Sequence, residues 1–315
     1  IHNMIKYFEF ENDIEKIEIL LSQLNNNKEL NFDKINKLNK EKNELYKKVY
    51  SNLDPWQKVQ VSRHGERPHT LDYVQNIFDD IVFLHGDKKY ADDNAILGGL
   101  AKINGKSIFF IGTEKGNTME TRIKHNFGMA KPEGYRKVQR LLNLAEKFKL
   151  PFISFVDTAG AFPGKDAEER GQSESIASSI LYFLKTKIPT VSIIIGEGGS
   201  GGAIGIAASD RVLMLEHSIY SVISPEGCAS ILWRNTEFSR EAAKTLKLTS
   251  ADCKTFKIID DIIPEPHGGA HRHPIKQAEI LKAKIISLID ELNQISIKEL
   301  VQIRKAKYLN ITSDI

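Results

Sequence analysis

The chain has 315 residues, of which 41% are hydrophobic and 27% charged, and its formal net charge is +3. This is enough apolar material for one large domain or a domain with an appendage, and no apolar run approaches the roughly 18 to 20 residues of a membrane span. No charged-then-apolar leader opens the chain, and its weak, dispersed basic charge gives no strong nucleic-acid signal, so we expect a cytoplasmic protein without a membrane association. The two cysteines, Cys228 and Cys253, form no Cys-x-x-Cys pair, and we expect structural roles for both.

The first 50 residues predict two amphipathic helices separated by an Asn-rich break at residues 25–27. Apolar residues recur there at helical spacing, namely Ile14, Ile17, Leu21 and Leu24, then Ile35, Leu38, Leu45 and Val49. Such narrow apolar stripes are typical of a helical arm that lies against another surface. We therefore assign residues 1–55 to an N-terminal helical arm and residues 56–315 to the main domain. The pattern leaves open whether the arm packs on this chain or on a partner subunit.

From about residue 70 the pattern changes to strands, beginning with AILGGLAKINGKSIFFIGTEKG, in which Asn104-Gly105 predicts a tight hairpin. The segment Gly99–Ser107 reads G-x5-G-K-S, one residue longer than the phosphate-loop spacing, and it lies in a hairpin where a strand-to-helix junction is required. We therefore exclude a nucleotide-triphosphate loop. The segment Asp157-Thr158-Ala159-Gly160 matches the D-x-x-G pattern of a nucleotide-sensing switch, but without a phosphate loop there is no bound triphosphate for such a switch to sense, so we exclude this interpretation as well.

Two strand-loop-helix units follow a helix that starts at Pro132. The first comprises the strand PFISFVD, the loop TAGAFPG and a helix expected to start at Asp166, with Glu169 completing a capping pair. The second comprises the strand TVSIII, the glycine loop at residues 196–202 and a short helix, and its strand core starts 39 residues after that of the first. This repetition predicts a parallel sheet with both loops at the carboxyl edge, where α/β folds bind ligands.

The remaining sequence predicts two more strands, RVLMLE and SIYSVI, and a helix that starts at Ser224-Pro225. A long final helix follows, with Ala278, Leu281, Ile285, Leu288 and Leu292 in line. The steps of three and four residues favour a helix that docks on the sheet.

The glycine loop, GEGGSGG, satisfies two well-known motifs at once. Gly196, Gly198 and Gly201 match the dinucleotide fingerprint G-x-G-x-x-G, and Glu216 follows at the distance of a ribose-binding carboxylate. Against this interpretation, only about residues 201–208 are available for the helix, and Glu197 places a carboxylate where a pyrophosphate would lie.

The serine-hydrolase elbow G-x-S-x-G is matched by Gly198, Ser200 and Gly202, with Asp260 or Asp261 and then His271 in triad order. In a third interpretation, the backbone amides of Gly201 and Gly202 hold an oxyanion at the start of the helix. Glycines that only permit close helix–strand packing are the remaining alternative.

Five stretches together carry a resemblance to a known family, and they are NFGMAKPEGYRKVQRLLNLAEKF, FVDTAGAFPGKDAEERGQSESIA, IIIGEGGSGGAIGIAASDRV, YSVISPEGCASILW and DDIIPEPHGGAHRHP. The chain resembles the alpha subunits of bacterial-type acetyl-coenzyme A carboxylase carboxyltransferases. The resemblance runs from the N-terminal helices to about residue 300. It implies an α/β, crotonase-like (ClpP/crotonase) fold of repeated β-β-α units with an N-terminal helical extension.

The resemblance also implies an activity. The family transfers the carboxyl group of carboxybiotin, presented by biotin carboxyl carrier protein, to acetyl-coenzyme A, and the malonyl-coenzyme A that forms enters fatty-acid biosynthesis. The alpha subunit acts with a beta subunit in an alpha2-beta2 complex, alongside biotin carboxylase. No cofactor is expected to bind this chain directly, and zinc is expected only on the beta subunit. Stand-alone crotonase-type enzymes, either hydratases or decarboxylases, are the alternative, beside a serine hydrolase that uses Ser200.

Carried onto this sequence, the family's oxyanion hole falls on the amides of Gly201 and Gly202, which would hold the ureido oxygen of biotin. Gly198 and Gly199 would shape the approach, and Gly160 and Ala161 would help to wall the carboxybiotin side. His267 and His273 are additional to the family pattern, and we expect structural or surface roles for them rather than a metal site.

Overall fold

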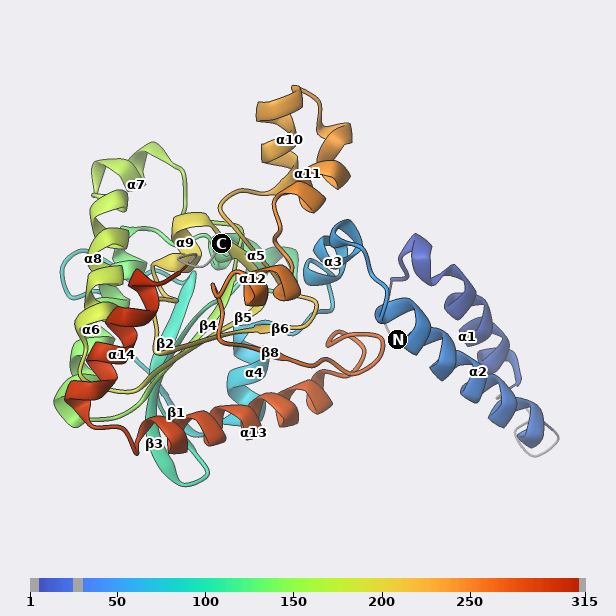
Figure 1. The fold of residues 1–315 in the computed structure, drawn as a ribbon, viewed down its shortest axis with the longest axis horizontal. Coiled ribbons are helices and arrows are strands. Elements are labelled where there is room, and N and C mark those ends of the chain that lie inside the picture. The colour runs from blue at the N-terminus through green and yellow to red at the C-terminus, as the bar shows by residue number, and fades with distance from the viewer. Residues whose placement is uncertain (1–5, 25–30, 312–315) are drawn as a thin grey trace.

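The computed structural model describes residues 6–24 and 31–311, so the break predicted at residues 25–27 lies outside the described residues. Its strands form a sheet in the order β1-β2-β3-β4-β5-β6-β8, and β7 pairs with the end of β5 (Figure 1). The strands are β1 (Asp79–Phe83), β2 (Ile96–Ile103), β3 (Lys106–Thr113), β4 (Phe152–Thr158), β5 (Thr190–Gly199), β6 (Arg211–Leu215), β7 (Ile219–Ser221) and β8 (Asp261–Ile263).

Helices cover both faces of this sheet (Figure 1). The longer ones are α1 (Asn12–Leu24), α2 (Phe32–Tyr50), α6 (Pro132–Phe148), α8 (Gln172–Lys185), α13 (Pro274–Leu292) and α14 (Ile297–Leu309). The shorter ones are α3 (Pro55–Ser62), α4 (Thr70–Ile77), α5 (Met119–Lys124), α7 (Lys165–Glu169), α9 (Ser200–Ile204), α10 (Pro225–Trp233), α11 (Ser239–Thr245) and α12 (Ser250–Thr255). Among the described helices, none is both long and apolar enough to cross a bilayer.

Two hydrophobic cores lie on opposite faces of the sheet because successive strand residues point to opposite sides. In β3, Ile108 and Phe110 pack in the core under α4 and α13, whereas Phe109 and Ile111 pack in the core under α6, α8 and α9. The central strands are buried on both faces, which explains their nearly continuous apolar sequences.

Several local predictions are confirmed. Residues 104–105 connect β2 and β3 as a two-residue hairpin, with φ of +49° and +74° at Asn104 and Gly105. The helix α6 starts at Pro132, and α10 starts at Pro225, with the Ser224 side chain accepting a hydrogen bond from the amide of Gly227. Cys228 and Cys253 are buried and not joined in a disulfide.

Other local predictions are wrong. The first element after residue 70 is the helix α4 rather than a strand. The helix α7 starts at Lys165 with Gly164 as its N-cap, so Asp166 lies in the first turn and makes no capping pair with Glu169. The long helix α13 is not the last, since α14 follows it.

The N-terminal arm consists of α1 and α2, which project from the body of the molecule (Figure 1). Its root packs on this chain, because the buried carboxylate of Glu11 accepts hydrogen bonds from Tyr50 Oη and Arg272 Nη2, both at 2.8 Å. Arg272 belongs to the loop before α13. The predicted apolar stripes face inward, with Ile14, Ile17 and Leu21 buried. The domain boundary at residue 55 stays a prediction.

Candidate functional site

The two loops identified in the sequence meet at the carboxyl edge of the sheet. Strands β4 and β5 are parallel neighbours, and Thr158 pairs with Gly198. A Cβ atom at Gly202 would lie 2.5 Å from the backbone carbon of Gly160 and 2.6 Å from the amide nitrogen of Ala161. A Cβ at Gly199 would overlap the backbone oxygen of Ala159. The structure therefore brings Gly202 into direct contact with Gly160 and Ala161, and Gly199 into direct contact with the preceding residues of the same loop, Thr158 and Ala159.

The other glycines of this stretch have different neighbours. A Cβ at Gly196 would collide with the Asp157 carboxylate, and one at Gly198 would lie 2.7 Å from the Tyr220 ring. At Gly201, in contrast, the nearest atoms are those of Ile176, at 3.8 Å. The packing of this chain therefore explains why Gly196, Gly198 and Gly202 carry no side chain, but it does not explain Gly201.

The short helix α9 begins where β5 ends. Strand β5 continues through Gly199, and α9 is only five residues long, from Ser200 to Ile204. Its first amides, including those of Gly201 and Gly202, have no acceptor within the helix. Ser200 has a φ of +51°, a strained conformation for a residue with a side chain.

This geometry does not support a dinucleotide site. Gly196, Gly198 and Gly199 belong to an extended strand rather than to a phosphate-binding loop, and five residues are too few for a crossover helix. The side chain of Glu216 accepts a hydrogen bond from the amide of Glu265 at 3.1 Å. The proposed ribose-binding carboxylate is therefore part of a loop contact.

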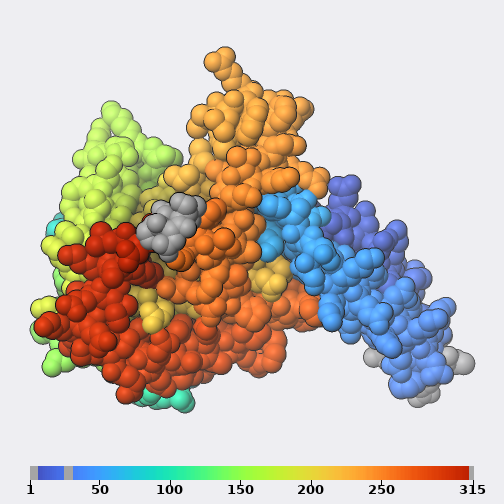
Figure 2. All heavy atoms as spheres, viewed as in Figure 1, coloured from blue at the N-terminus to red at the C-terminus, as the bar shows by residue number. Residues whose placement is uncertain are grey.

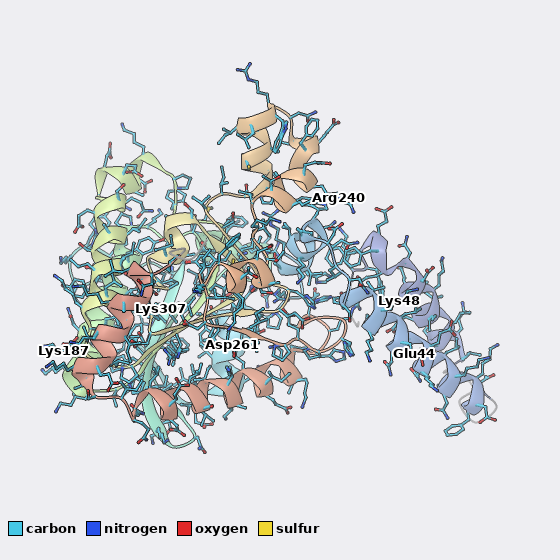
Figure 3. The ribbon with its side chains drawn as sticks, in the orientation of Figure 1. Glu44, Lys48, Lys187, Arg240, Asp261 and Lys307 are labelled. Carbon is cyan, nitrogen blue, oxygen red and sulfur yellow. The ribbon has the colours of Figure 1, made fainter. Side chains whose placement is uncertain are left out.

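The predicted hydrolase residues contact different parts of the molecule. Asp260 accepts hydrogen bonds from the amide of Val212 and from Lys307, on the side of α14 (Figure 3). Asp261 pairs with Lys284 of α13 at 2.6 Å. His271 stacks on His64 at the arm root, with a ring separation of 4.2 Å. None of the contacts given for these residues includes Ser200, so the triad predicted from the sequence is not assembled in the described part of the chain.

Beneath the two loops lies a cluster of charges that we call the edge cluster, made of Arg63, His69, Lys115, Asp157 and Glu197. Lys115 Nζ lies 2.8 Å from Asp157 Oδ1 and 2.6 Å from Glu197 Oε2. Arg63 Nε donates to Glu197 Oε1 at 2.6 Å, and His69 Nδ1 lies 3.0 Å from Asp157 Oδ2. Asp157 also accepts a hydrogen bond from the amide of Glu197. Four segments are thus tied together at the end of β4 and β5.

Opposite charges determine the protonation of this cluster. Burial alone would raise the pKa of Asp157, but Lys115 and His69 outweigh it and hold the pKa well below its usual value. The pKa of Glu197 is lowered in the same way, against burial, by Lys115 and Arg63. Burial would lower the pKa of His69, yet the hydrogen bond and charge of Asp157 raise it overall. The carboxylates are therefore ionised, and the His69 ring takes up a proton more readily than a free histidine does.

A cleft of about 300 Å³ opens beside the edge cluster. Its walls include Arg63, His69, Lys115 and Glu197 of the cluster, Arg122 of α5, Phe127 and Ala159. Ala159 directly precedes Gly160, so the cleft borders the glycine edge.

Sequence analysis did not identify His69, Lys115 or Arg122 as site residues. Two signals were present, since Lys115 comes two residues after β3 and Asp157 is the penultimate residue of β4. Charges directly after buried strands mark the carboxyl edge of a parallel sheet. His69 and Arg63 had no such signal, because they lie in and next to short helices whose position depends on the whole fold.

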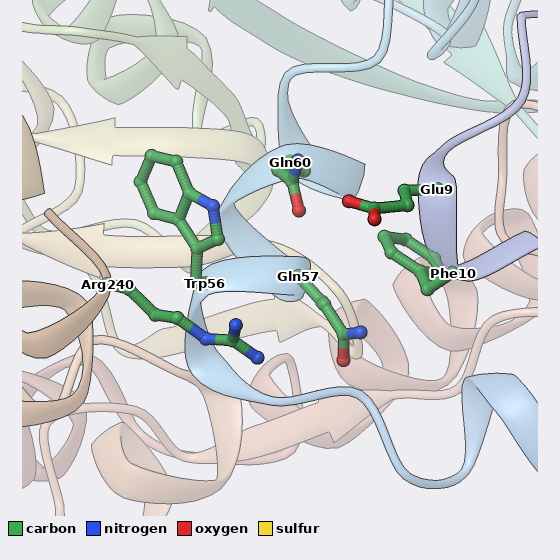
Figure 4. A pocket seen from close by; sticks show the side chains of 6 residues that line it. All are labelled: Glu9, Phe10, Trp56, Gln57, Gln60 and Arg240. Atoms are coloured by element: carbon green, nitrogen blue, oxygen red, sulfur yellow. The ribbon is translucent and has the colours of Figure 1, made fainter. Parts of the chain in front are cut away.

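The surface around the edge is hollowed. Figure 2 shows a notch between the projection that includes α7 and the projection formed by α10 and α11, and Figure 1 shows α9 at the base of this notch. A separate cleft of about 430 Å³ lies at the arm root, between Phe10, Trp56 and Arg240 (Figure 4). It contains none of the site residues predicted from the sequence.

In the described part of the chain, no group of three His, Cys, Asp or Glu residues is placed to hold a metal ion. His267 and His273 are exposed, whereas His271 is buried at the arm root. The three histidines are thus in different environments.

Comparison with known proteins identifies the family. The model of the acetyl co-enzyme A carboxylase carboxyltransferase-like family matches residues 7–312. The acetyl-coenzyme A carboxylase carboxyl transferase subunit alpha of Paramagnetospirillum magneticum is 50% identical over 307 residues, which cover 96% of this chain and 97% of the relative. The subunit of the same name from Rhodospirillum centenum is 50% identical over 309 residues, covering 97% and 98% of the two chains.

The fold is also found in solved structures. The transcarboxylase 12S structure with methylmalonyl-coenzyme A and methylmalonic acid bound superposes with a TM-score of 0.59 at 16% identity. The match covers 73% of this chain and 42% of that chain, so this protein spans less than half of the transcarboxylase subunit. At this identity the likeness shows the fold alone, and the predicted crotonase-like α/β architecture is confirmed.

Proposed function

The chain belongs to the family of acetyl-coenzyme A carboxylase carboxyltransferase alpha subunits, and from this premise we propose that the edge formed by residues 158–161 and 196–202 is its half of the transfer site. In the proposed reaction, carboxybiotin on a carrier protein supplies the carboxyl group, the methyl carbon of acetyl-coenzyme A receives it to give malonyl-coenzyme A, and the biotin nitrogen takes up the methyl proton. The product serves fatty-acid biosynthesis.

The amides of Gly201 and Gly202 are the groups that we assign to the chemistry. They begin α9 without intrahelical acceptors, and they would donate hydrogen bonds to the ureido oxygen of biotin as negative charge develops on it. A preorganised donor of this kind is worth about 3 kcal/mol to a transition state. Gly198, Gly199, Gly160 and Ala161 would form the wall of the carboxybiotin side.

One observation carries this assignment. Gly202 is buried against residues 160–161, whereas Gly201 is half-buried, and its missing side chain would meet nothing closer than 3.8 Å. A glycine that the fold itself does not need is readily explained by a ligand that must approach the backbone closely.

The partners follow from the same premise. We propose that the chain acts in an alpha2-beta2 complex with a beta subunit that carries the zinc and most of the coenzyme A site, and that biotin carboxyl carrier protein and biotin carboxylase complete the system in the cytoplasm. No cofactor would bind this chain directly.

Reconstitution tests the function. The purified chain is mixed with a carboxyltransferase beta subunit, and malonyl-coenzyme A formation is followed with carboxybiotin-loaded carrier protein. We expect a stable complex that catalyses transfer and no transfer by the chain alone. If the chain alone acts on acyl-coenzyme A, or the complex transfers nothing, the proposal is wrong.

The variant Gly201→Ala tests the site. The added methyl group has room within this chain, so the complex should assemble and unfold as the wild type does, while the transfer rate falls at least tenfold. Ser200→Ala is the matched control, since the proposal gives the hydroxyl no role, and it should retain transfer. Loss of transfer in Ser200→Ala, with Gly201→Ala active, would instead point to the hydroxyl.

A further inference from the structure

The cleft beside the glycine edge contains a histidine whose second ring nitrogen has no partner. Asp157 is ionised and acts as an acceptor, so His69 Nδ1 carries the proton of their 3.0 Å hydrogen bond. His69 Nε2 is buried and has no hydrogen-bond partner within residues 6–24 and 31–311, and the side chain is only 9% exposed. When the ring takes up a second proton, which the neighbouring Asp157 favours by raising the pKa of His69, Nε2 becomes a second donor. Such an unmatched buried donor is costly unless a ligand accepts from it.

A second donor in the same cleft is also unmatched. Arg122 Nε donates to the backbone oxygen of Gly116 at 3.3 Å, but no carboxylate within residues 6–24 and 31–311 pairs with its guanidinium. The neighbouring cations differ, since Arg63 is paired with Glu197 and Glu226, and Lys115 with Asp157 and Glu197. Glu197 also lines the cleft, and its two carboxylate oxygens are taken up by Arg63 and Lys115, which they contact at 2.6 Å each. The groups of this cleft that have no carboxylate partner of their own, the Arg122 guanidinium and His69 Nε2, are therefore the ones that can donate to a ligand.

One further part of the wall, at Phe127, is apolar and strained, while Ser62 and His64 also line the cleft. Asn126, Phe127 and Gly128 have successive φ values of +48°, +54° and +77°, and the Phe127 side chain is 44% exposed at the cleft. Two consecutive left-handed residues with side chains cost free energy, and such strain concentrates at ligand sites. Phe127 would shield the donors from water on one side and strengthen their interaction with an anion.

We propose that this cleft binds a carboxylate anion, held by the guanidinium of Arg122 and by His69 Nε2. The planar guanidinium matches the two oxygens of a carboxylate. A volume of about 300 Å³ suits a small organic acid. In terms of the proposed function, on which this identification of the source rests, the anion is the carboxylate of the malonyl group beside the glycine edge. Free bicarbonate has the same chemistry and is the alternative source.

Direct titration tests the anion site without any catalysis. The isolated full-length chain is titrated with monomethyl malonate, bicarbonate and phosphate, with chloride held constant, and binding is followed by NMR of the imidazole ring of His69. We expect saturable binding of monomethyl malonate that weakens at least tenfold in Arg122→Gln and is partly restored in Arg122→Lys. Lys124→Gln is the matched control, because this exposed residue of the same helix removes an equal charge outside the cleft. Its affinity should stay within twofold of the wild type.

Each other outcome has a defined meaning. Equal affinity of the wild type and Arg122→Gln, or tighter binding of phosphate than of monomethyl malonate, overturns the carboxylate site. Binding of bicarbonate without binding of monomethyl malonate overturns the malonyl source and assigns bicarbonate instead.

The reconstituted complex distinguishes this inference from the proposed function. In the reverse direction, Arg122→Gln should raise the KM for malonyl-coenzyme A about tenfold, while the forward KM for acetyl-coenzyme A, which lacks the carboxylate, stays within twofold. Equal changes in both KM values would contradict the inference. If the wild-type complex transfers nothing, the proposed function fails, and the titration of the isolated chain still decides whether the cleft binds a carboxylate.

Discussion

The edge cluster and the arm root both bury charge, and both leave buried nitrogens without a partner among the described residues, but they differ in what lies beside those nitrogens. At the arm root these are Arg272 Nε and both ring nitrogens of His271, and neither residue lines the cleft of about 430 Å³ there. At the arm root, Glu11 is fully buried and accepts from Phe8 N, Tyr50 and Arg272, and the Arg272 guanidinium lies 4.5 Å from the Tyr7 ring. In the edge cluster the carboxylates are also paired, but His69, whose Nε2 has no partner among the described residues, and the neighbouring Arg122 both line a cleft. Buried charge alone therefore indicates structure, whereas unmatched donors beside a cleft indicate a ligand.

The arm root should show the largest effect on stability. In Glu11→Ala, Arg272 loses its carboxylate partner in a buried position, and removal of one partner of such a pair typically costs about 3 to 5 kcal/mol. We expect urea unfolding of the chain to reveal this loss, while transfer per folded complex is unchanged. Glu9→Ala is the control, because Glu9 lies in the same turn but is exposed. An equal effect of both variants would mean that the arm root does not depend on the buried pair.

The next effect is on the pH dependence of stability. Burial lowers the pKa of His271 to about 2, so the folded chain keeps this ring neutral while the unfolded chain takes up a proton below about pH 6.5. The unfolded state then binds more protons, and stability falls as the pH decreases. Between pH 7 and pH 5, linkage predicts a loss of about 2 kcal/mol from this ring.

Urea unfolding at pH 7 and pH 5 measures this loss. In His271→Phe the ring stays apolar at both values, so the difference between them should shrink by about 2 kcal/mol relative to the wild type. An unchanged difference would show that His271 is not the residue that titrates. His64 has its pKa lowered by burial as well, and it contributes in the same direction.

The edge cluster should give the smallest effect, with the opposite sign. The pKa of His69 is raised, so the stability contributed by its bond to Asp157 is fully present below about pH 6.5 and is lost as the pH rises through the folded value. Because the contributions of His271 and His64 are common to both proteins, the unfolding free energy of the wild type relative to that of His69→Phe should decline slightly between pH 6 and pH 9. If the unfolding free energy of the wild type relative to that of His69→Phe instead rose with pH, the pKa of His69 would be lowered by folding, as that of His271 is, and the predicted contrast between the two clusters would be wrong.

The features that the sequence predicted well depend on local backbone demands. Asn104 and Gly105 have positive φ in the hairpin that their identity predicted, and Pro132 opens a helix, because these residues restrict or extend the available φ at single positions. The continuous burial of β4 and β5 likewise corresponds to a local pattern, since their sequences are nearly unbroken apolar runs. The helix α4 was missed because its apolar residues are few and short helices depend on tertiary packing.

The charged half of the candidate site could not be predicted in the same way. His69 and Asp157 are 88 residues apart, Lys115 and Glu197 are 82 apart, and Arg63 and Glu197 are 134 apart. No local pattern links such pairs, since their meeting depends on the order of strands in the sheet and on the position of α3 and α4 across its edge. The same holds for the separation of Asp260, Asp261 and His271 from Ser200.

By itself, the sequence determined the family, the crotonase-like fold and the place of the candidate site at residues 196–202. Each of these depends on long motifs or on glycine positions that can be recognised in consecutive residues. Only the tertiary structure decided that Gly196, Gly198 and Gly202 are needed for packing and that Gly201 is not. Whether a side chain would fit at a glycine depends on the neighbouring atoms, and these come from segments distant in the sequence. It also decided which buried charges are matched and which face a cleft, because charge pairing depends on distances between segments that the sequence keeps far apart.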